Sequence, residues 1–346
     1  MKWKILLPCW ISLACVLNTV QGQDAVFSQF YSTALYLNPA LAGVEEELTI
    51  NMNHRTQWKT LAFPYTTTQV SAILPYYTNK HMKPFGHIGG LGLSVYNDMA
   101  GENYSLKTTG ANLTGGYNLP FDSKMVNQLS FGLQLGFINK TIDNSNFQWG
   151  EQYDPYVGFD ATIAPTDITD FQNRSFIDIN AGIFWWFNPE PEKSKLIKSI
   201  NSGISFNHLN NPDESMLAHT TNRLPLLYKY HGGIVFYLAE HFTVSINTLL
   251  AFQNNANQQN FGSYLSYVFN TYSDGYFRNS VFRLGAWARV NDSFIGLLEM
   301  ESSFFKVGFS YDLNTSTLRY NNRAVGTYEI HIGMKFSEHA KPKSRY

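Results

Sequence analysis

The chain has 346 residues with a formal net charge of −1, and only 15% of its residues are charged whereas 16% are aromatic. This length accommodates one large β domain or two ordinary domains. Low charge with 25 glycines and many aromatic residues differs from the usual composition of soluble proteins and is typical of membrane β-barrels. The near-neutral charge argues against a nucleic-acid partner.

The first 22 residues have the pattern of an export signal. Lys2 and Lys4 form a basic start, residues 5–17 are mainly apolar, and the small residue Gly22 precedes Gln23. We therefore predict a signal peptide over residues 1–22 and a mature chain beginning at Gln23. Removing the two lysines leaves 23 basic side chains against 26 acidic ones, a net charge of −3.

Both cysteines, Cys9 and Cys15, fall within this predicted signal. The mature chain would then have no thiol, no disulfide and no cysteine metal site. An alternative is a lipoprotein signal at residues 12–15, although Ser12 occupies the position where a large aliphatic residue is usual. The apolar stretch is too short for a spanning helix, and no apolar run of about 20 residues follows.

Residues 23–46 form a polar-aromatic segment that precedes the first strand-like pattern. Its aromatic residues fit neither a strand nor a helix period, and Asn38-Pro39 interrupts any helix before the sequence Ala-Leu-Ala-Gly. Such aromatic side chains need a surface to pack on, so we expect this segment to fill the mouth of a barrel or to bind a partner. Those aromatic residues are Phe27, Phe30, Tyr31 and Tyr36.

From residue 47 onward the dominant pattern is alternation of apolar and polar residues over about 9 to 12 positions, which suits tilted transmembrane strands. Residues 129–137 show it clearly, with leucine and phenylalanine on one face and small or polar residues on the other. The pattern predicts about fourteen strands, an even number as in bacterial barrels. They are 47–58, 66–75, 87–97, 106–118, 127–139, 176–187, 199–209, 226–238, 241–252, 258–270, 276–290, 293–301, 303–313 and 326–336.

We therefore predict an all-β fold: a single transmembrane β-barrel of about 14 antiparallel strands over residues 47–336, with the polar-aromatic segment before strand 1 and a basic tail over residues 337–346. The longest connection, residues 143–175, would lie outside the cell if the chain starts in the periplasm. Aromatic residues near strand ends are candidates for interfacial girdles, or else ordinary core residues: Trp185, Trp186, Phe187, Tyr228, Tyr230, Tyr237, Tyr264, Tyr267 and Tyr272.

Catalytic and cofactor motifs are not found in the sequence. The nine histidines have no metal-ligand spacing, and there is no phosphate loop or nucleophile elbow. The glycines of residues 89–92 fit a strand whose small inward residues allow close approach. We expect no enzyme activity, no cofactor and no metal, although a barrel hydrolase with residues converging from distant strands remains an alternative.

Charged residues of both signs occupy the predicted inward faces of the last strands. They would either bind an inserted segment through charged hydrogen bonds or line a solvated lumen. The main candidates are Arg283, Lys306, Asp312 and Glu329, accompanied by Arg289, Glu299, Glu301 and Lys335.

Four stretches resemble the PorP/SprF family of type IX secretion membrane proteins. Residues 23–43 read QDAVFSQFYSTALYLNPALAG, residues 54–58 read HRTQW, and residues 306–313 and 327–336 resemble the closing strands of that family. One departure is that residues 337–346 extend past the terminal aromatic Phe336. The resemblance covers the mature chain.

The resemblance implies an outer-membrane component of the type IX secretion or gliding machinery in a Gram-negative bacterium. Its expected partners are a periplasmic ring lipoprotein, a large secreted surface protein with a C-terminal sorting domain, or both, together with outer-membrane lipid. The competing hypothesis is a passive porin or ligand uptake barrel. The candidate residues for partner binding or lumen filling are Phe27, Phe30, Tyr31, Tyr36, Asn38, Pro39, Arg55 and Trp58.

Overall fold

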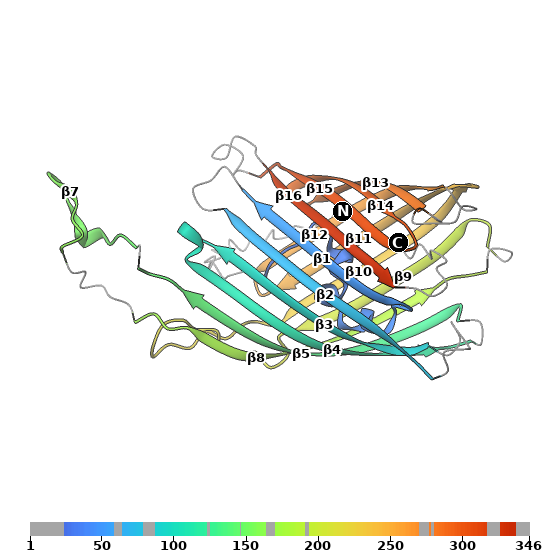
Figure 1. The fold of residues 1–346 in the computed structure, drawn as a ribbon, viewed down its shortest axis with the longest axis horizontal. Helices are drawn as coiled ribbons and strands as arrows, with labels where there is room; N and C mark the ends of the chain where they lie inside the picture. The colour runs from blue at the N-terminus through green and yellow to red at the C-terminus, as the bar shows by residue number, and fades with distance from the viewer. Residues whose placement is uncertain are drawn as a thin grey trace, which may run out of the picture.

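The computed structural model describes residues 24–58, 64–78, 87–122, 125–145, 147–163, 170–190, 194–269, 277, 280–316 and 326–336. Fourteen antiparallel strands in this part of the chain form one closed barrel (Figure 1). The prediction of a single all-β barrel is therefore confirmed. The strands are β1 (Leu48–Gln57), β2 (Tyr65–Tyr77), β3 (His87–Ala100), β4 (Leu106–Pro120), β5 (Asn127–Ile142), β8 (Arg174–Phe187), β9 (Ile197–Asn207), β10 (Leu227–Ala239), β11 (Phe242–Gln253), β12 (Ala256–Phe269), β13 (Ser280–Arg289), β14 (Ser293–Glu301), β15 (Phe305–Asn314) and β16 (Thr327–Phe336).

The barrel closes because the first strand pairs with the last. Residues Leu48 to Thr56 of β1 lie opposite Phe336 to Tyr328 of β16, and every other barrel strand pairs with its neighbours along the chain. With an even number of strands, β1 begins and β16 ends at the same end of the barrel, here called the terminus end. The opposite end carries the connections after β5 and β9 and is called the loop end (Figure 1).

The predicted alternation is present in the wall. In β5, Leu133 and Leu135 are 68% and 57% exposed on the outer face, whereas Gln134 between them is 4% exposed. The outer faces are rich in leucine, isoleucine and phenylalanine, and the inner faces in glycine, serine, asparagine and charged residues. Alternation decides which side of the wall a residue occupies because successive side chains of a strand point to opposite faces.

Two members of the predicted aromatic girdle are on the inside instead. Trp186 and Tyr264 are 4% and 2% exposed and belong to the buried core, so the girdle interpretation is wrong for them. The physical reason is parity: Trp185 and Phe187 face outward, and Trp186 between them must face inward.

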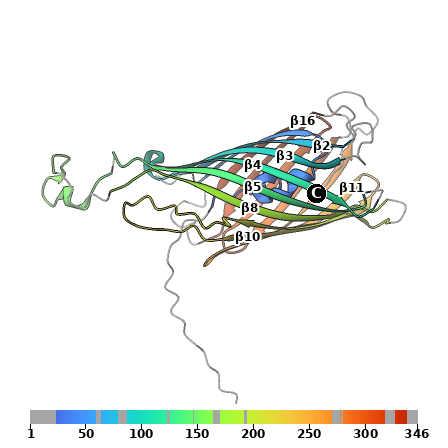
Figure 2. The same ribbon diagram turned by 90° about the horizontal axis from the view of Figure 1, so that it is seen from below.

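The N-terminal segment lies inside the barrel. It contains η1 (Phe30–Ser32), the short helix α1 (Ala34–Leu37) and η2 (Pro39–Gly43), and Figure 2 shows it in blue between the walls. Asp24 contacts residues at the loop end, whereas Gly43 packs on residues near the terminus end, where β1 then begins. The segment therefore runs along most of the lumen before the first strand.

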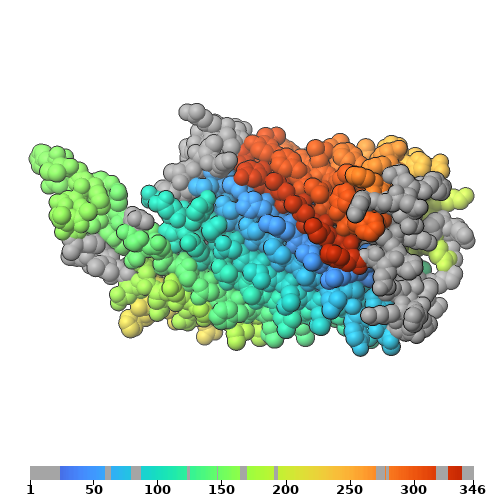
Figure 3. All heavy atoms as spheres, in the orientation of Figure 1, coloured from blue at the N-terminus to red at the C-terminus, as the bar shows by residue number. Residues whose placement is uncertain are grey.

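The connection between β5 and β8 extends away from the wall at the loop end (Figures 1 and 3). Its described part contains η5 (Gly150–Gln152) and a small hairpin of β6 (Tyr153–Asp154) with β7 (Gly158–Phe159). A further 3-10 turn, η4 (Glu102–Tyr104), lies at the same end. No helix among the described residues is long and apolar enough to span a membrane.

Some predictions lie outside the described residues. These are the signal peptide over residues 1–22, its alternative lipoprotein site, the basic tail over residues 337–346 and the girdle candidate Tyr272.

Candidate functional site

The candidate site is the contact between the N-terminal segment and the inner wall of the barrel. On the side of β3, β4 and β5, the backbone of η2 lies directly against the glycines Gly90, Gly116 and Gly132 of the inner wall. A Cβ atom added at Gly116 would be 2.2 Å from the nitrogen of Gly43, and one added at Gly132 would be 2.2 Å from the nitrogen of Ala40. Only glycine permits this approach, so the wall is shaped for the segment.

Asn38 connects η2 to three further strands. Its Oδ1 accepts a hydrogen bond from the nitrogen of Ala40 at 2.9 Å and so caps η2, whose first residue is Pro39. Its Nδ2 donates to the carbonyl oxygens of Ile183 in β8 at 3.1 Å and Ile204 in β9 at 3.4 Å, and it lies 3.1 Å from Nε2 of His231 in β10. The buried Asn-Pro pair thus fixes both the bend of the segment and its position in the lumen.

Aromatic contacts hold η1 on the opposite side of the lumen. The ring of Phe30 lies 5.1 Å from that of Trp287, and the ring of Tyr31 lies 5.5 Å from that of Tyr264, both edge-on. All four side chains are buried. Edge-on pairs of this kind add about 0.5–1.5 kcal/mol each beyond the burial of area.

A charged network binds the residues just before η1. Glu329 accepts hydrogen bonds from the backbone nitrogens of Ser28 at 2.7 Å and Gln29 at 3.2 Å, and Asp312 accepts one from Ser28 Oγ at 2.6 Å. Arg55 donates to the carbonyl oxygen of Val26 at 2.6 Å and pairs with Asp312 at 3.4 Å. These inner-wall charges therefore contact the segment directly.

A second charged cluster lies nearer the terminus end. Arg283 pairs with both Glu299 and Glu301, Lys335 pairs with Glu301, and Lys306 pairs with Glu299 at 3.1 Å. The ammonium of Lys306 also lies 4.9 Å from the ring centroid of Tyr31. The cluster thus touches the segment through a cation–π contact, and its charged groups pair with one another within the wall.

The first described residues are held at the loop end by a histidine between two carboxylates. Nε2 of His208 lies 2.8 Å from Asp24 and Nδ1 lies 2.9 Å from Asp178. Burial alone would lower the pKa of His208, but the two carboxylates raise it to about 10. Burial likewise opposes ionisation of Asp24, yet the positive charge of His208 lowers its pKa to about 2. Both groups are therefore charged at neutral pH.

Seven of the eight candidate residues of the segment and of β1 meet in this contact, and one does not. Trp58 lies beyond the end of β1 and packs against Tyr65, with ring centroids 5.4 Å apart, rather than against the segment. Tyr36 packs on Phe27 at 5.5 Å, and its hydroxyl donates to the carbonyl oxygen of Ala25 at 2.8 Å.

Several contact residues were not singled out from sequence. On the segment they are Asp24, Ser28 and Gln29; on the wall they are Gln134, His208, Lys229 and Trp287, with Asp178 bonded to His208. Tyr264, expected in the girdle, contacts Tyr31 instead. The alternation of inward and outward side chains places those wall residues that belong to strands on the inner face. It does not show which of them contact the segment.

Noncovalent contacts hold the N-terminal segment inside the barrel. Among the described residues, no group of three or more histidine, cysteine, aspartate or glutamate side chains could hold a metal ion. The charged groups pair with each other or with the backbone of the segment. The arrangement is that of a segment packed into a barrel.

A closed barrel with an apolar outer face and its own N-terminal segment in the lumen defines the class of this protein, an outer-membrane-type β-barrel. Residues 19–334 match the family described as type IX secretion system membrane protein PorP/SprF. The chain therefore belongs to the PorP/SprF family. No curated protein matches it.

Several solved structures match the chain at low similarity. The Ralstonia pickettii toluene transporter TbuX is 10% identical with a TM-score of 0.48, covering 88% of this chain and 94% of its own. A Pseudomonas aeruginosa FadL homologue is 11% identical with a TM-score of 0.46 over the same shares. BamA from Haemophilus ducreyi lacking POTRA domains 1–3 is 11% identical with a TM-score of 0.41, covering 84% and 71%.

Proposed function

We propose that this protein is a non-enzymatic outer-membrane component of the type IX secretion machinery that acts through protein contacts rather than by diffusion through its lumen. Family membership supplies the secretion context. The observation that carries the proposal is the packing of residues 24–44 inside the barrel, where almost all of them are buried.

The partner in this proposal is a periplasmic ring lipoprotein, a large secreted surface protein, or both. The terminus end would face the periplasm and the loop end the outside, because barrels of this type have short periplasmic turns and longer outside loops. The hairpin of β6 and β7 would then extend outward, carrying Tyr156, which is 95% exposed. An exposed aromatic side chain of this kind suits contact with another protein.

Affinity purification from native membranes tests the proposal. We expect ring lipoproteins or one large surface protein to co-purify, and we expect the purified protein to show no steady conductance in planar bilayers. A protein that purifies alone and conducts ions steadily would favour the passive porin instead.

A triple variant tests whether the N-terminal segment takes part in partner binding, here called its docking role. Replacing Phe27, Phe30 and Tyr31 by Ala removes the buried aromatic contacts of η1 and of Phe27 before it, but no strand pairing. We expect normal insertion but weaker partner co-purification and weaker surface delivery of the secreted protein. The matched control is Phe137→Ala, which removes an outward ring that is 57% exposed. If the triple variant does not insert and the control does, the segment is a folding element and the docking role is wrong.

A further inference from the structure

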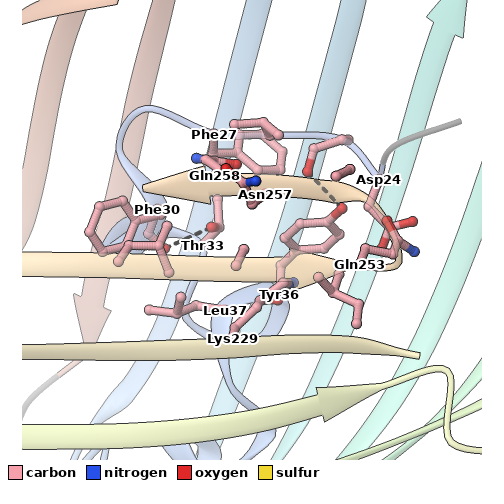
Figure 4. A pocket seen from close by; sticks show the side chains of 16 residues that line it. Asp24, Phe27, Phe30, Thr33, Tyr36, Leu37, Lys229, Gln253, Asn257 and Gln258 are labelled. Carbon is pink, nitrogen blue, oxygen red and sulfur yellow. Dashed lines mark hydrogen bonds between the residues drawn. The ribbon is translucent and has the colours of Figure 1, made fainter. Parts of the chain in front are cut away.

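Charges of opposite sign meet inside the lumen at the loop end. Asp24 and Lys229 both line the small cavity beside the N-terminal segment (Figure 4). Next to them His208 bonds to Asp24 and to Asp178, so two carboxylates face two positive groups there. A stretch with charges of one sign lies outside the lumen instead, in the connection between β5 and β8.

This connection is acidic. The predicted mature chain has 23 basic and 26 acidic side chains, and six of the acidic ones fall in residues 143–173, which contain no lysine, arginine or histidine. The rest of the mature chain then has 23 basic against 20 acidic side chains, a net charge of +3. Negative charge is thus concentrated in one connection at the loop end. The six residues are Asp143, Glu151, Asp154, Asp160, Asp167 and Asp170.

The basic residues at the base of this connection already have acidic neighbours. Lys140 pairs with Glu214 and Arg174 pairs with Asp213, both in the connection after β9. Lys107 lies near Asp143, where the chain leaves the wall. Residues 147–163, here called the arm, are farther from the wall and carry negative charges alone (Figures 1 and 3).

The arm is folded by its own contacts. Gln152 is 7% exposed, and its side chain donates to the carbonyl oxygen of Ile163 at 3.0 Å and accepts from the nitrogen of Trp149 at 3.0 Å. The rings of Tyr153 and Phe159 lie 5.6 Å apart across the hairpin of β6 and β7. These contacts define the shape of the arm without a partner.

The tip of the arm holds two side chains out in solvent. Oδ1 of Asp154 accepts hydrogen bonds from the nitrogens of Tyr156 at 2.7 Å and Val157 at 3.0 Å, and Gly158 takes a φ of 87° after them. Tyr156 and Val157 are 95% and 82% exposed, so they add little to the stability of the hairpin. A tyrosine held in place before binding loses little entropy on binding, and tyrosine is a common anchor of protein interfaces.

We propose that the arm inserts Tyr156 and Val157 into an apolar pocket of a protein partner, and that lysine and arginine side chains border this pocket. The exposed pair requires an apolar surface, and the carboxylates around it require positive charge at the rim. This inference rests on the proposed function, because it takes the loop end as outward and protein contacts as the way in which the barrel acts.

Photo-crosslinking in intact cells tests the tip. Replacing Tyr156 by p-benzoylphenylalanine in the full-length protein keeps an aromatic ring there and bonds it to a neighbour on illumination. We expect one protein product, with the bond mapped by mass spectrometry to a surface that has lysine or arginine beside it. The same replacement at Tyr104 in η4, 38% exposed at the same end, should not give this product. A glycolipid product, no product, or a bond to a surface without basic residues would overturn the proposal.

Neutral variants test the charge. Glu151→Gln, Asp154→Asn and Asp160→Asn remove three negative charges, and asparagine keeps the Oδ1 acceptor that both aspartates use in their turns. Combined in the cross-linking chain, they should lower the yield about threefold or more, because rim charges speed association. Glu102→Gln, outside the arm, should leave the yield unchanged. An equal yield in the triple variant would contradict the basic rim.

A measurement on the unaltered arm guards against misfolding of the triple variant. In isolated outer membranes, the yield from position 156 should fall as salt rises from about 50 mM to about 500 mM, because salt screens exposed charges. A yield that does not depend on salt would overturn the charge complementarity.

Failure of this inference differs from failure of the proposed function. Type IX components that co-purify, without a cross-link from position 156 to any protein, would leave the secretion role standing and overturn the arm as a docking surface. A cross-link to a basic surface of a protein outside the secretion machinery would support the arm and contradict the proposed function.

Discussion

At the scale of single residues, Glu329 connects the two ends of the chain. Its carboxylate accepts the backbone nitrogens of Ser28 and Gln29 and the side-chain amide of Asn53, and it is fully buried. A buried carboxylate is stable only when its oxygens are paired, and here the pairing comes from the inserted segment. Withdrawal of the segment would therefore remove two of its partners.

The substitution Glu329→Gln tests this dependence. It keeps the size of the side chain but replaces an oxygen acceptor by an amide donor that faces backbone N–H groups. Because hydrogen bonds to charged groups contribute about 1.5–3 kcal/mol, we expect hydrogen exchange at the amides of residues 28 and 29 to rise about tenfold or more. The control is Glu102→Gln at an exposed position of η4. Unchanged protection in Glu329→Gln would mean that the carboxylate does not hold the segment.

The pair of Asp24 with His208 gives a pH dependence at the same scale. The raised pKa of His208, about 10, gives stability that is fully present below the unfolded value of 6.5 and lost as pH rises through 10. The lowered pKa of Asp24, about 2, gives stability that is present above 3.8 and lost as pH falls through 2. Asp178 pairs with the same histidine, and Lys140 and Lys229 stabilise the Asp24 carboxylate.

We therefore expect the protection of residues 24–26 from hydrogen exchange, after correction for the intrinsic rate, to be greatest between about pH 4 and pH 6.5, to decline steadily as pH rises from 6.5 to about 10, and to decline again as pH falls from 3.8 to about 2. In His208→Gln, which has no charge to lose, the protection should be weaker at neutral pH and should not fall further between pH 8 and pH 10. A wild-type protein that opens between pH 6 and pH 7 would show that the carboxylates do not hold the histidine in its charged form.

At the scale of elements, η2 and the strands beneath it fit each other closely. The backbone of η2 lies against glycine on β4 and β5, so the contact tolerates no side chain at those positions. Neighbouring positions on the same strand differ sharply: a Cβ at Gly116 would collide with Gly43, whereas one at Gly115 would meet nothing within 4 Å. This difference supplies a matched pair of variants.

We expect Gly116→Ala to displace η2 without preventing barrel closure, because β4 keeps its strand pairing. Protease cleavage near residues 38–44 should become detectable in folded protein. Gly115→Ala, one residue away on the outer face, should behave as the wild type. Equal protease resistance in both variants would show that the backbone contact is not required to seat the segment.

At the scale of the whole molecule, closure of β1 on β16 removes every free edge from the barrel. The outer faces are apolar over fourteen strands, so this surface requires lipid or detergent. We expect the protein to be recovered in the outer-membrane fraction, to migrate faster in electrophoresis without heating than after heating, and to begin at Gln23 by N-terminal sequencing. Recovery from the periplasm without detergent would contradict a membrane barrel.

The sequence by itself determined the barrel. Alternation over long strands places apolar residues such as Leu133 and Leu135 on the lipid side and Gln134 on the inside, because the period of a strand is two. The same rule applied to Trp186 and Tyr264 would have placed them inside. The conspicuous stretch over residues 23–43 also identified the segment that the barrel encloses, since its aromatic residues fit no strand.

Only the tertiary structure decided which residues hold that segment. Ser28 and Glu329 are 301 positions apart, and they meet because closure of the barrel and the register of β15, β16 and β1 bring Asp312, Glu329 and Arg55 to one side of the lumen. Sequence shows which side chains of a strand point inward, but it does not show the register of one strand against the next. Lys229 and His208 contact the segment for the same reason. Which wall residue meets which residue of the segment depends on strand register and on the path of the segment, and neither is a local property of the sequence.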